Sequence, residues 1–238
     1  MARHSHWAQI KLKKGATDKK RGKIFTKHAH LIEVVARLGG DPNMNAGLRL
    51  AIDNARADNM PRENIERAIK KGTGELKGAT QTEEITYEGY GPGGVALVIE
   101  TLTDNRNRTG QMVRRALEEH GGSLGGSGST SFLFETRGVM NVKKSISADE
   151  DELALIDAGA EDLDADSEGY TVFCAPSKLN EVKKKIEAAG FFIVSSEISL
   201  EPKTPMVVED GALAQKVISL VEALEENDDV LKVSTNMA

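Results

Sequence analysis

The sequence predicts an α+β, multidomain protein, with a small N-terminal all-α domain followed by two ferredoxin-like α/β domains, one inserted in the other. Three observations support this prediction. Apolar residues recur at helical spacing in the first 75 residues, an apolar strand pattern directly follows a glycine-rich stretch, and a complete β-α-β-β-α-β order lies between residues 138 and 200. The expected domains are 1–78, 79–136 plus 203–238, and 137–202.

The first 75 residues predict an N-terminal arm and three helices joined by short loops. The first helix is expected from about Thr17 to the stop at Gly39 and Gly40, the second from 45 to 58, and the third from Pro61 to Gly72. Helical spacing selects the residues that should face inward, which are Ile24, His28, Leu31, Ile32, Val35, Leu38, Leu48, Ile52, Ala55, Ile65, Ala68 and Ile69.

The middle of the chain predicts a strand that leads into a helix. Residues 95–102 are nearly all apolar, which is typical of a strand buried on both faces, and a helix is expected from Thr109 to His120. The glycines at 89–94 precede this strand. A phosphate-binding glycine loop would instead follow a strand and open a helix, so a tight turn and no cofactor are predicted. The composition of 121–129 predicts a mobile loop.

The remaining elements predict the insertion. A strand is expected at 131–135, and the inserted domain then has strands at 139–142, 160–163, 170–175 and 191–200, with helices at 150–158 and 178–189. A strand at 206–209, a helix at 212–226 and a strand at 230–235 would complete the unit that begins at Val95, because alone they are too small to bury a core. One continuous sheet and two sequential domains are the alternatives.

Charge is distributed unevenly along the chain. Residues 1–75 contain 16 of the 31 Lys and Arg but only 8 of the 37 Asp and Glu, a net charge of +8, which leaves −14 for the remainder. The single cysteine, Cys174, permits no internal disulfide and suits a reducing compartment. The sequence has no apolar run of the length that a membrane span needs, so a cytoplasmic protein without membrane contact is expected.

The basic N-terminal region is the strongest functional signal. It predicts nucleic-acid binding through phosphate contacts, with an aromatic side chain available to stack on a base. Arginines near the turn at 104–109, together with Arg114 and Arg115, form a second candidate patch, with an exposed loop and helix face as the alternative. The predicted nucleic-acid-binding residues are Trp7, Lys11, Lys13, Lys14, Lys19, Lys20, Arg21, Lys23, Lys27, Arg106 and Arg108.

Other candidate sites are weaker. His4, His6, His28 and His30 do not predict a metal site, because side chains two apart on a helix point away from each other. No Ser/His/Asp or Cys/His set is evident, so no catalytic residue is predicted. Ten acidic residues lie between Ser145 and Gly169 without Lys or Arg; they predict a solvated face or a docking surface for a basic protein or the ribosome.

Long segments of the chain resemble the YebC family. They include a start at His4-Ser-x-Trp7, the runs Lys20-Arg-Gly-Lys-Ile-Phe-Thr-Lys27 and Asn59-Met-Pro-x-x-Asn-Ile-Glu-Arg-Ala-Ile-Lys-Lys-Gly-Thr-Gly74, and Tyr87-Glu-Gly-Tyr-Gly-Pro-Gly-Gly94 with Leu102-Thr-Asp-Asn-Arg-Asn-Arg-Thr109. The chain departs from the usual start at Arg3 and His6, where Gly and Lys are expected.

The resemblance implies three domains and a role in gene expression. Members are generally named probable transcriptional regulatory proteins, mitochondrial relatives are translational activators, and bacterial relatives have been linked to relief of ribosome stalling. The leading hypothesis is therefore a non-enzymatic regulator that binds DNA through its basic N-terminal domain. The alternatives are a translation factor that binds ribosomal or transfer RNA and, as a third class, an enzyme.

Overall fold

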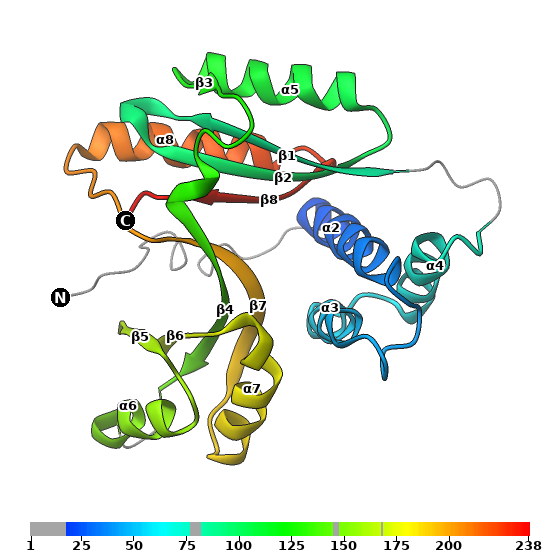
Figure 1. Cartoon of the computed structure of the whole chain (residues 1–238), viewed down its shortest axis with the longest axis vertical. Coiled ribbons are helices and arrows are strands. Elements are labelled where there is room, and N and C mark those ends of the chain that lie inside the picture. Colours follow the sequence, from blue (N-terminus) through cyan, green and yellow to red (C-terminus); the bar gives the residue numbers. More distant parts are fainter. Residues whose placement is uncertain (1–17, 77–81, 145–147, 168) are drawn as a thin grey trace. The chain divides into compact units, whose positions relative to one another are not determined.

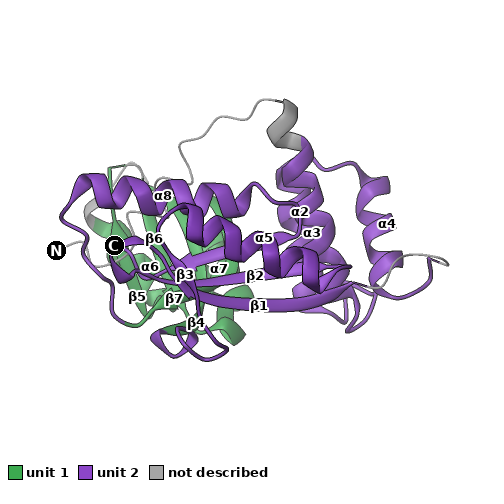
Figure 2. Ribbon diagram, turned by 90° about the horizontal axis from the view of Figure 1, so that it is seen from above, with its two compact units in different colours: residues 1–4, 134–203 green, residues 5–133, 204–238 purple. Residues whose placement is uncertain are grey.

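The computed structural model describes residues 18–76, 82–144, 148–167 and 169–238, with residues 18–21 and 148–149 described by their backbone alone (Figure 1). The chain forms two compact units (Figure 2). The first consists of residues 134–203, and the second holds the described residues before 134 and after 203. The fold class is confirmed, since N-terminal helices are followed by two antiparallel sheets. The domain boundaries proposed from the sequence stay a prediction.

Three helices form the N-terminal part of the second unit: α2 (Asp18–Ala36), α3 (Ala46–Ala57) and α4 (Arg62–Gly72). The Asn45 side chain caps α3 by accepting a hydrogen bond from the Leu48 backbone N–H. The core between the helices consists of Ile32, Ala36, Leu48, Ile52, Ala55, Met60, Ile65 and Ala68. The inward positions expected in α3 are thus confirmed. The expectation was wrong for Leu31 and for Leu38, which lies beyond the end of α2, because these side chains are 41% and 88% exposed.

Gly72 lies where α4 packs closely against α2. A Cβ atom at this position would lie 2.8 Å from the Ala36 Cβ and closer still to the Glu33 carbonyl oxygen. We expect Gly72→Ala to lower the free energy of unfolding by roughly 1–2 kcal/mol, because the two helices must move apart. Gly22→Ala in α2 is the control, since a Cβ there meets nothing within 4 Å and should stabilise the helix. Thermal unfolding of both variants tests this, and an unchanged midpoint for Gly72→Ala would contradict it.

The sheet of the second unit has the order β3-β1-β2-β8 and is antiparallel throughout. Its strands are β1 (Glu83–Tyr90), β2 (Ala96–Thr103), β3 (Ser123–Leu124) and β8 (Val230–Thr235). Helices α5 (Arg106–Glu119) and α8 (Gly211–Glu225) lie on the same face of this sheet (Figure 2). Their apolar residues, among them Val113, Leu117, Val217 and Leu220, form one core with Leu97 and Ile99 of β2.

Three details of this sheet differ from the expectation. Strand β1 was not expected, and its end overlaps the start of the tight turn predicted at 89–94. Gly89 is tolerated inside the strand because β3 comes so close that a Cβ would lie 2.6 Å from the Ser123 carbonyl oxygen. Residues 131–133 form a 3₁₀ turn rather than the start of a strand. The expected strand at 206–209 is reduced to one parallel bridge between Met206 and Met237.

The glycine-rich loop at 121–129 is held by hydrogen bonds, contrary to the expected mobility. The Glu88 carboxylate, 6% exposed, accepts hydrogen bonds of 2.7 Å from the backbone N–H groups of Gly128, Thr130 and Ser131. The Glu88 carbonyl oxygen also accepts one from the Gly125 N–H at 2.8 Å. Burial by itself raises the pKa of the carboxyl group, but these backbone donors lower the pKa of Glu88 to about 2. One charged side chain therefore fixes the loop to β1.

The first unit has the complete order β-α-β-β-α-β, in the antiparallel sheet β5-β6-β4-β7 of a ferredoxin-like fold. The expected element order is confirmed. Phe134 and Pro202, at the two ends of the unit, are paired across β4 and β7. The elements are β4 (Phe134–Lys143), α6 (Ala148–Asp157), β5 (Asp162–Ala165), β6 (Gly169–Cys174), α7 (Leu179–Ala188) and β7 (Ile193–Pro202).

Candidate nucleic-acid interface

The predicted binding residues divide into three groups by what the structure describes. Trp7, Lys11, Lys13 and Lys14 lie outside the described residues. The backbone of Lys19, Lys20 and Arg21 belongs to the first turns of α2. The third group comprises Lys23, Lys27, Arg106 and Arg108, whose side chains are described. Their assignment to nucleic acid stays a prediction.

Lys23 and Lys27 are half-buried on α2. The Lys23 Nζ donates a hydrogen bond of 3.0 Å to the Glu226 carbonyl oxygen, in the cap residue at the C-terminal end of α8. A cation at this end of a helix is favoured because the last carbonyl groups carry partial negative charge. One lysine of the basic face of α2 is therefore already hydrogen-bonded to the end of α8 in the same unit.

A buried acid links α2 and α4 to the residue that precedes β1. Glu33 is 4% exposed, forms an ion pair of 2.8 Å with the Lys71 Nζ, and accepts a hydrogen bond from the Thr82 hydroxyl. Arg37, directly after the end of α2, donates to the Thr82 carbonyl oxygen at 2.9 Å and to the Glu84 carboxylate at 3.1 Å. Burial lowers the pKa of the neighbouring His30. These contacts involve residues on either side of the segment 77–81.

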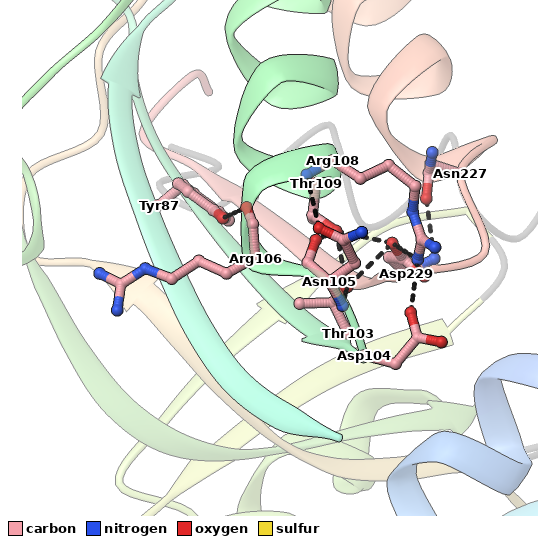
Figure 3. A network of polar contacts seen from close by, with 9 residues as sticks. All are labelled: Tyr87, Thr103, Asp104, Asn105, Arg106, Arg108, Thr109, Asn227 and Asp229. Carbon is pink, nitrogen blue, oxygen red and sulfur yellow. Dashed lines mark hydrogen bonds and ion pairs between the residues drawn. The ribbon is translucent and has the colours of Figure 1, made fainter. Parts of the chain in front are cut away.

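A polar network centred on Asp229 fixes the start of α5 (Figure 3). The Asp229 Oδ2 accepts hydrogen bonds from the Thr109 hydroxyl at 2.7 Å, from the Thr103 hydroxyl at 3.2 Å and from the Arg108 guanidinium at 2.7 Å. Burial would raise the pKa of Asp229, but the hydrogen bonds from Arg108 and Thr109 lower it overall. Asn105 caps the helix by accepting from the Arg108 N–H.

The four arginines of α5 differ in whether their side chains form ion pairs. Arg108 pairs with both Asp104, at 2.9 Å, and Asp229, and Arg115 pairs with Glu119 at 2.7 Å. Arg106 and Arg114 are exposed and have no ion pair or side-chain hydrogen bond among the residues that the structure describes. In Figure 3 the Arg106 side chain extends away from the Asp229 network. Two arginines of α5 therefore remain available for an external anion.

An open hollow of about 290 Å³ lies along this face of α5. Its side wall includes Tyr87 of β1, whose hydroxyl donates to the Arg106 carbonyl oxygen at 3.3 Å. Burial raises the pKa of Tyr87, so the hydroxyl keeps its proton. The sequence prediction named Arg106 and Arg108 as binding residues and placed Arg114 and Arg115 in the same candidate patch, but it did not include Tyr87. The spacing of Arg106, Gly110 and Arg114 at intervals of four residues is the signal that could have grouped them on one face of the helix.

The structure also bears on the metal site, the membrane span, the cysteine and the acidic residues considered in the sequence analysis. Among the described residues, no group of three or more His, Cys, Asp or Glu has the arrangement of a metal site. No helix among them is both long enough and apolar enough to cross a membrane. Cys174 is buried in β6, and burial raises the pKa of its thiol. The docking role expected for the acidic residues of 145–169 stays a prediction.

Comparison with known proteins places the whole chain in one family. Residues 5–75 match the model for the TACO1/YebC protein N-terminal domain, and residues 82–237 match the model for the TACO1/YebC second and third domain. A "Probable transcriptional regulatory protein" of Halothermothrix orenii is 49% identical over 240 residues, covering 99% of this chain and 94% of that protein. "Probable transcriptional regulatory protein CT1665" of Chlorobaculum tepidum is 50% identical, covering 100% of this chain and 95% of that protein.

A solved structure agrees with the sequence relatives. The crystal structure of a conserved hypothetical protein, Aq1575 from Aquifex aeolicus, is similar with a TM-score of 0.89 and 47% sequence identity. The similarity covers 98% of this chain and 97% of that chain. Both family models and the full-length relatives thus lead to one conclusion: the chain belongs to the TACO1/YebC family.

Proposed function

We propose that this protein is a non-enzymatic regulator of gene expression that binds DNA through its basic N-terminal region. The observation that carries the proposal is the concentration of 16 of the 31 Lys and Arg in the first 75 residues of a chain whose overall net charge is −6. Such a segregated basic segment supplies phosphate contacts that the average charge conceals. The names of the relatives, probable transcriptional regulatory proteins, support regulation of transcription.

Sequence-specific reading by α3 and α4 is not part of the proposal. Arg62 is paired with Glu66 at 2.7 Å on the exposed face of α4. Arg56 and Arg67 are exposed, and their side chains have no hydrogen bond or ion pair among the described residues. Contacts of exposed arginines with phosphates fix position and affinity but carry no base information. The proposal is therefore limited to backbone binding, and RNA on the ribosome is the competing target.

Neutralising the start of α2 tests the proposal. We expect Lys19→Gln/Lys20→Gln/Arg21→Gln to weaken binding to a labelled 20-base-pair duplex at least tenfold at 150 mM salt. The slope of log K against log salt should flatten by about 0.9 for each phosphate that the variant no longer binds. The matched control is Arg56→Gln/Arg67→Gln/Lys70→Gln, which removes the same charge from α3 and α4 and should change the affinity less than threefold.

The outcome is read by fluorescence anisotropy, with circular dichroism as the check on folding. A folded α2 variant with unchanged affinity and slope would contradict binding through the N-terminal region. Purified ribosomes and unrelated DNA serve as competitors in the same assay. If ribosomes remove the unmodified protein from every duplex, translation rather than transcription is its level of action.

A further inference from the structure

We propose that the hollow on α5 between Arg106 and Arg114 is a second nucleic-acid site, which binds the phosphodiester backbone separately from the basic N-terminal region. The inference rests on the proposed function, because it assigns a further surface to the same class of ligand. Its residues belong to the part of the chain that is acidic overall, with a net charge of −14 over residues 76–238. A hollow that is lined by arginines and no acid in such a segment suits an anionic ligand.

The charged residues that line the hollow, among those the structure describes, are all positive. Its wall combines two arginines with uncharged side chains and contains no carboxylate; the principal lining residues are Tyr87, Arg106, Gly110, Gln111, Arg114 and Leu124. A second hollow, of about 460 Å³ on the helices of the N-terminal part, differs in this respect. It has one lysine, Lys70, against three acids, Asp41, Glu66 and Glu75, and therefore does not suit an anion.

Neighbouring contacts distinguish the two available arginines from the two that are occupied. Arg108 and Arg115 already bond to carboxylates of their own chain at 2.7–2.9 Å. Releasing either arginine for a phosphate would break these ion pairs, whereas Arg106 and Arg114 can bind without breaking any contact that the structure describes. The Asp229 network keeps the first turn of α5, and with it Arg106, in place.

The geometry of α5 suits an extended anion better than a small one. Arg106 and Arg114 are eight residues apart, which corresponds to about 12 Å along a helix axis. Gly110 lies between them, and because it has no side chain the Tyr87 ring can lie close to the helix there: a Cβ at Gly110 would be 3.3 Å from the Tyr87 hydroxyl oxygen. Gln111 supplies an amide, and the Tyr87 ring and Leu124 supply an apolar wall for a sugar or base. A chain of phosphates linked by sugars matches this sequence of groups.

Adjacent arginines on the same helix provide a matched pair of variants. We expect Arg114→Gln to weaken the binding of both a 12-nucleotide single-stranded RNA and a 20-base-pair DNA duplex about threefold to fivefold. Arg115→Gln removes the same charge one residue away and should change the affinity less than twofold. The double variant Arg106→Gln/Arg114→Gln should weaken binding at least tenfold and flatten the salt slope by about 1.8 on the duplex or 1.4 on the single strand.

Three comparisons decide the outcome. If the unmodified protein binds and the α2 variant fails, while Arg106→Gln/Arg114→Gln binds normally, the second site is refuted and the proposed function stands. If the unmodified protein binds neither RNA nor DNA, the proposed function itself fails. If poly-glutamate of equal charge displaces the nucleic acid from the unmodified protein but not from the double variant, the hollow takes an acidic protein, and the inference is overturned. The RNA and DNA arms identify the source of the phosphodiester.

Discussion

Glu88→Gln is expected to lower the free energy of unfolding by about 2–3 kcal/mol at pH 7, the largest loss that we expect from any isosteric change in this protein. The carboxylate accepts hydrogen bonds from three backbone N–H groups. In glutamine an NH₂ group, which only donates, replaces one of the two oxygens, so at least one of these N–H groups would face another donor. A pKa lowered from 4.5 to about 2 corresponds to about 3 kcal/mol, and solvent screening near the loop reduces this figure.

The same interaction predicts a pH dependence with a definite sign. The pKa of Glu88 is lower in the folded protein than in the unfolded chain, so its stabilising contribution is fully present above about pH 4.5 and is lost as the pH falls toward 2. The difference between the unmodified protein and Glu88→Gln should therefore shrink over this range. Urea unfolding at pH 7 and at pH 3, with amide hydrogen exchange at Gly128 and Thr130 as the local readout, measures it.

Glu118→Gln is the control for Glu88→Gln. Glu118 is exposed on α5 and has no side-chain partner among the residues described. Its replacement should leave both the unfolding midpoint and the exchange at Gly128 unchanged. Equal stabilities for the unmodified protein and Glu88→Gln at pH 7 would show that the glycine-rich loop is held by other contacts.

Asp229→Ala is expected to lower the free energy of unfolding by about 2–3 kcal/mol. The carboxylate is the shared acceptor for the hydroxyls of Thr103 and Thr109, both at most 1% exposed, and buried donors that lose an acceptor cost roughly 1–3 kcal/mol each. The expected loss lies below the sum for two donors because Thr109 keeps its contact with the Asn105 carbonyl oxygen. Thermal unfolding measures the loss, and hydrogen exchange at Thr109 localises it to the start of α5.

The adjacent acid supplies the comparison for Asp229→Ala. Asp228 is exposed and has no hydrogen bond or ion pair among the described residues, so Asp228→Ala should change stability by less than about 0.5 kcal/mol. If both alanine variants unfold at the same temperature, the Asp229 network does not stabilise the protein. If only Asp229→Ala is destabilised, the start of α5 depends on a residue that lies 120 positions away from Thr109 in the sequence.

The elements predicted best are those that carry their own local signals. The helices of the N-terminal part have apolar spacing, and a capping residue or a glycine marks an end of the helix, as Asn45 does for α3 and Gly72 for α4. The β-α-β-β-α-β unit was predicted for the same reason. Strand β1 was missed because Gly89 and the glycines that follow it are typical of turns, while the reason for Gly89, the close approach of Ser123, depends on a distant segment.

The candidate site could be predicted only in part. Composition identifies a basic region and an arginine-bearing turn, but it does not distinguish arginines that are paired from arginines that are available. Arg108 and Arg106 are two residues apart, and the difference between them depends on Asp229, 121 positions further along the chain. The expected mobility of 121–129 failed for a similar reason, because Glu88 lies outside that segment.

The pairing of Phe134 with Pro202 has a consequence for how this architecture can change over time. The chain enters and leaves the ferredoxin-like unit on neighbouring strands, where opposed Cα atoms are about 5 Å apart. A gap of this size can be bridged by a few residues. The chain between β3 and α8 of the second unit would therefore keep its path if residues 134–203 were replaced by another segment. The inserted unit is thus a cassette, which recombination can replace while the helices and sheet that carry the proposed binding surfaces keep their own connections.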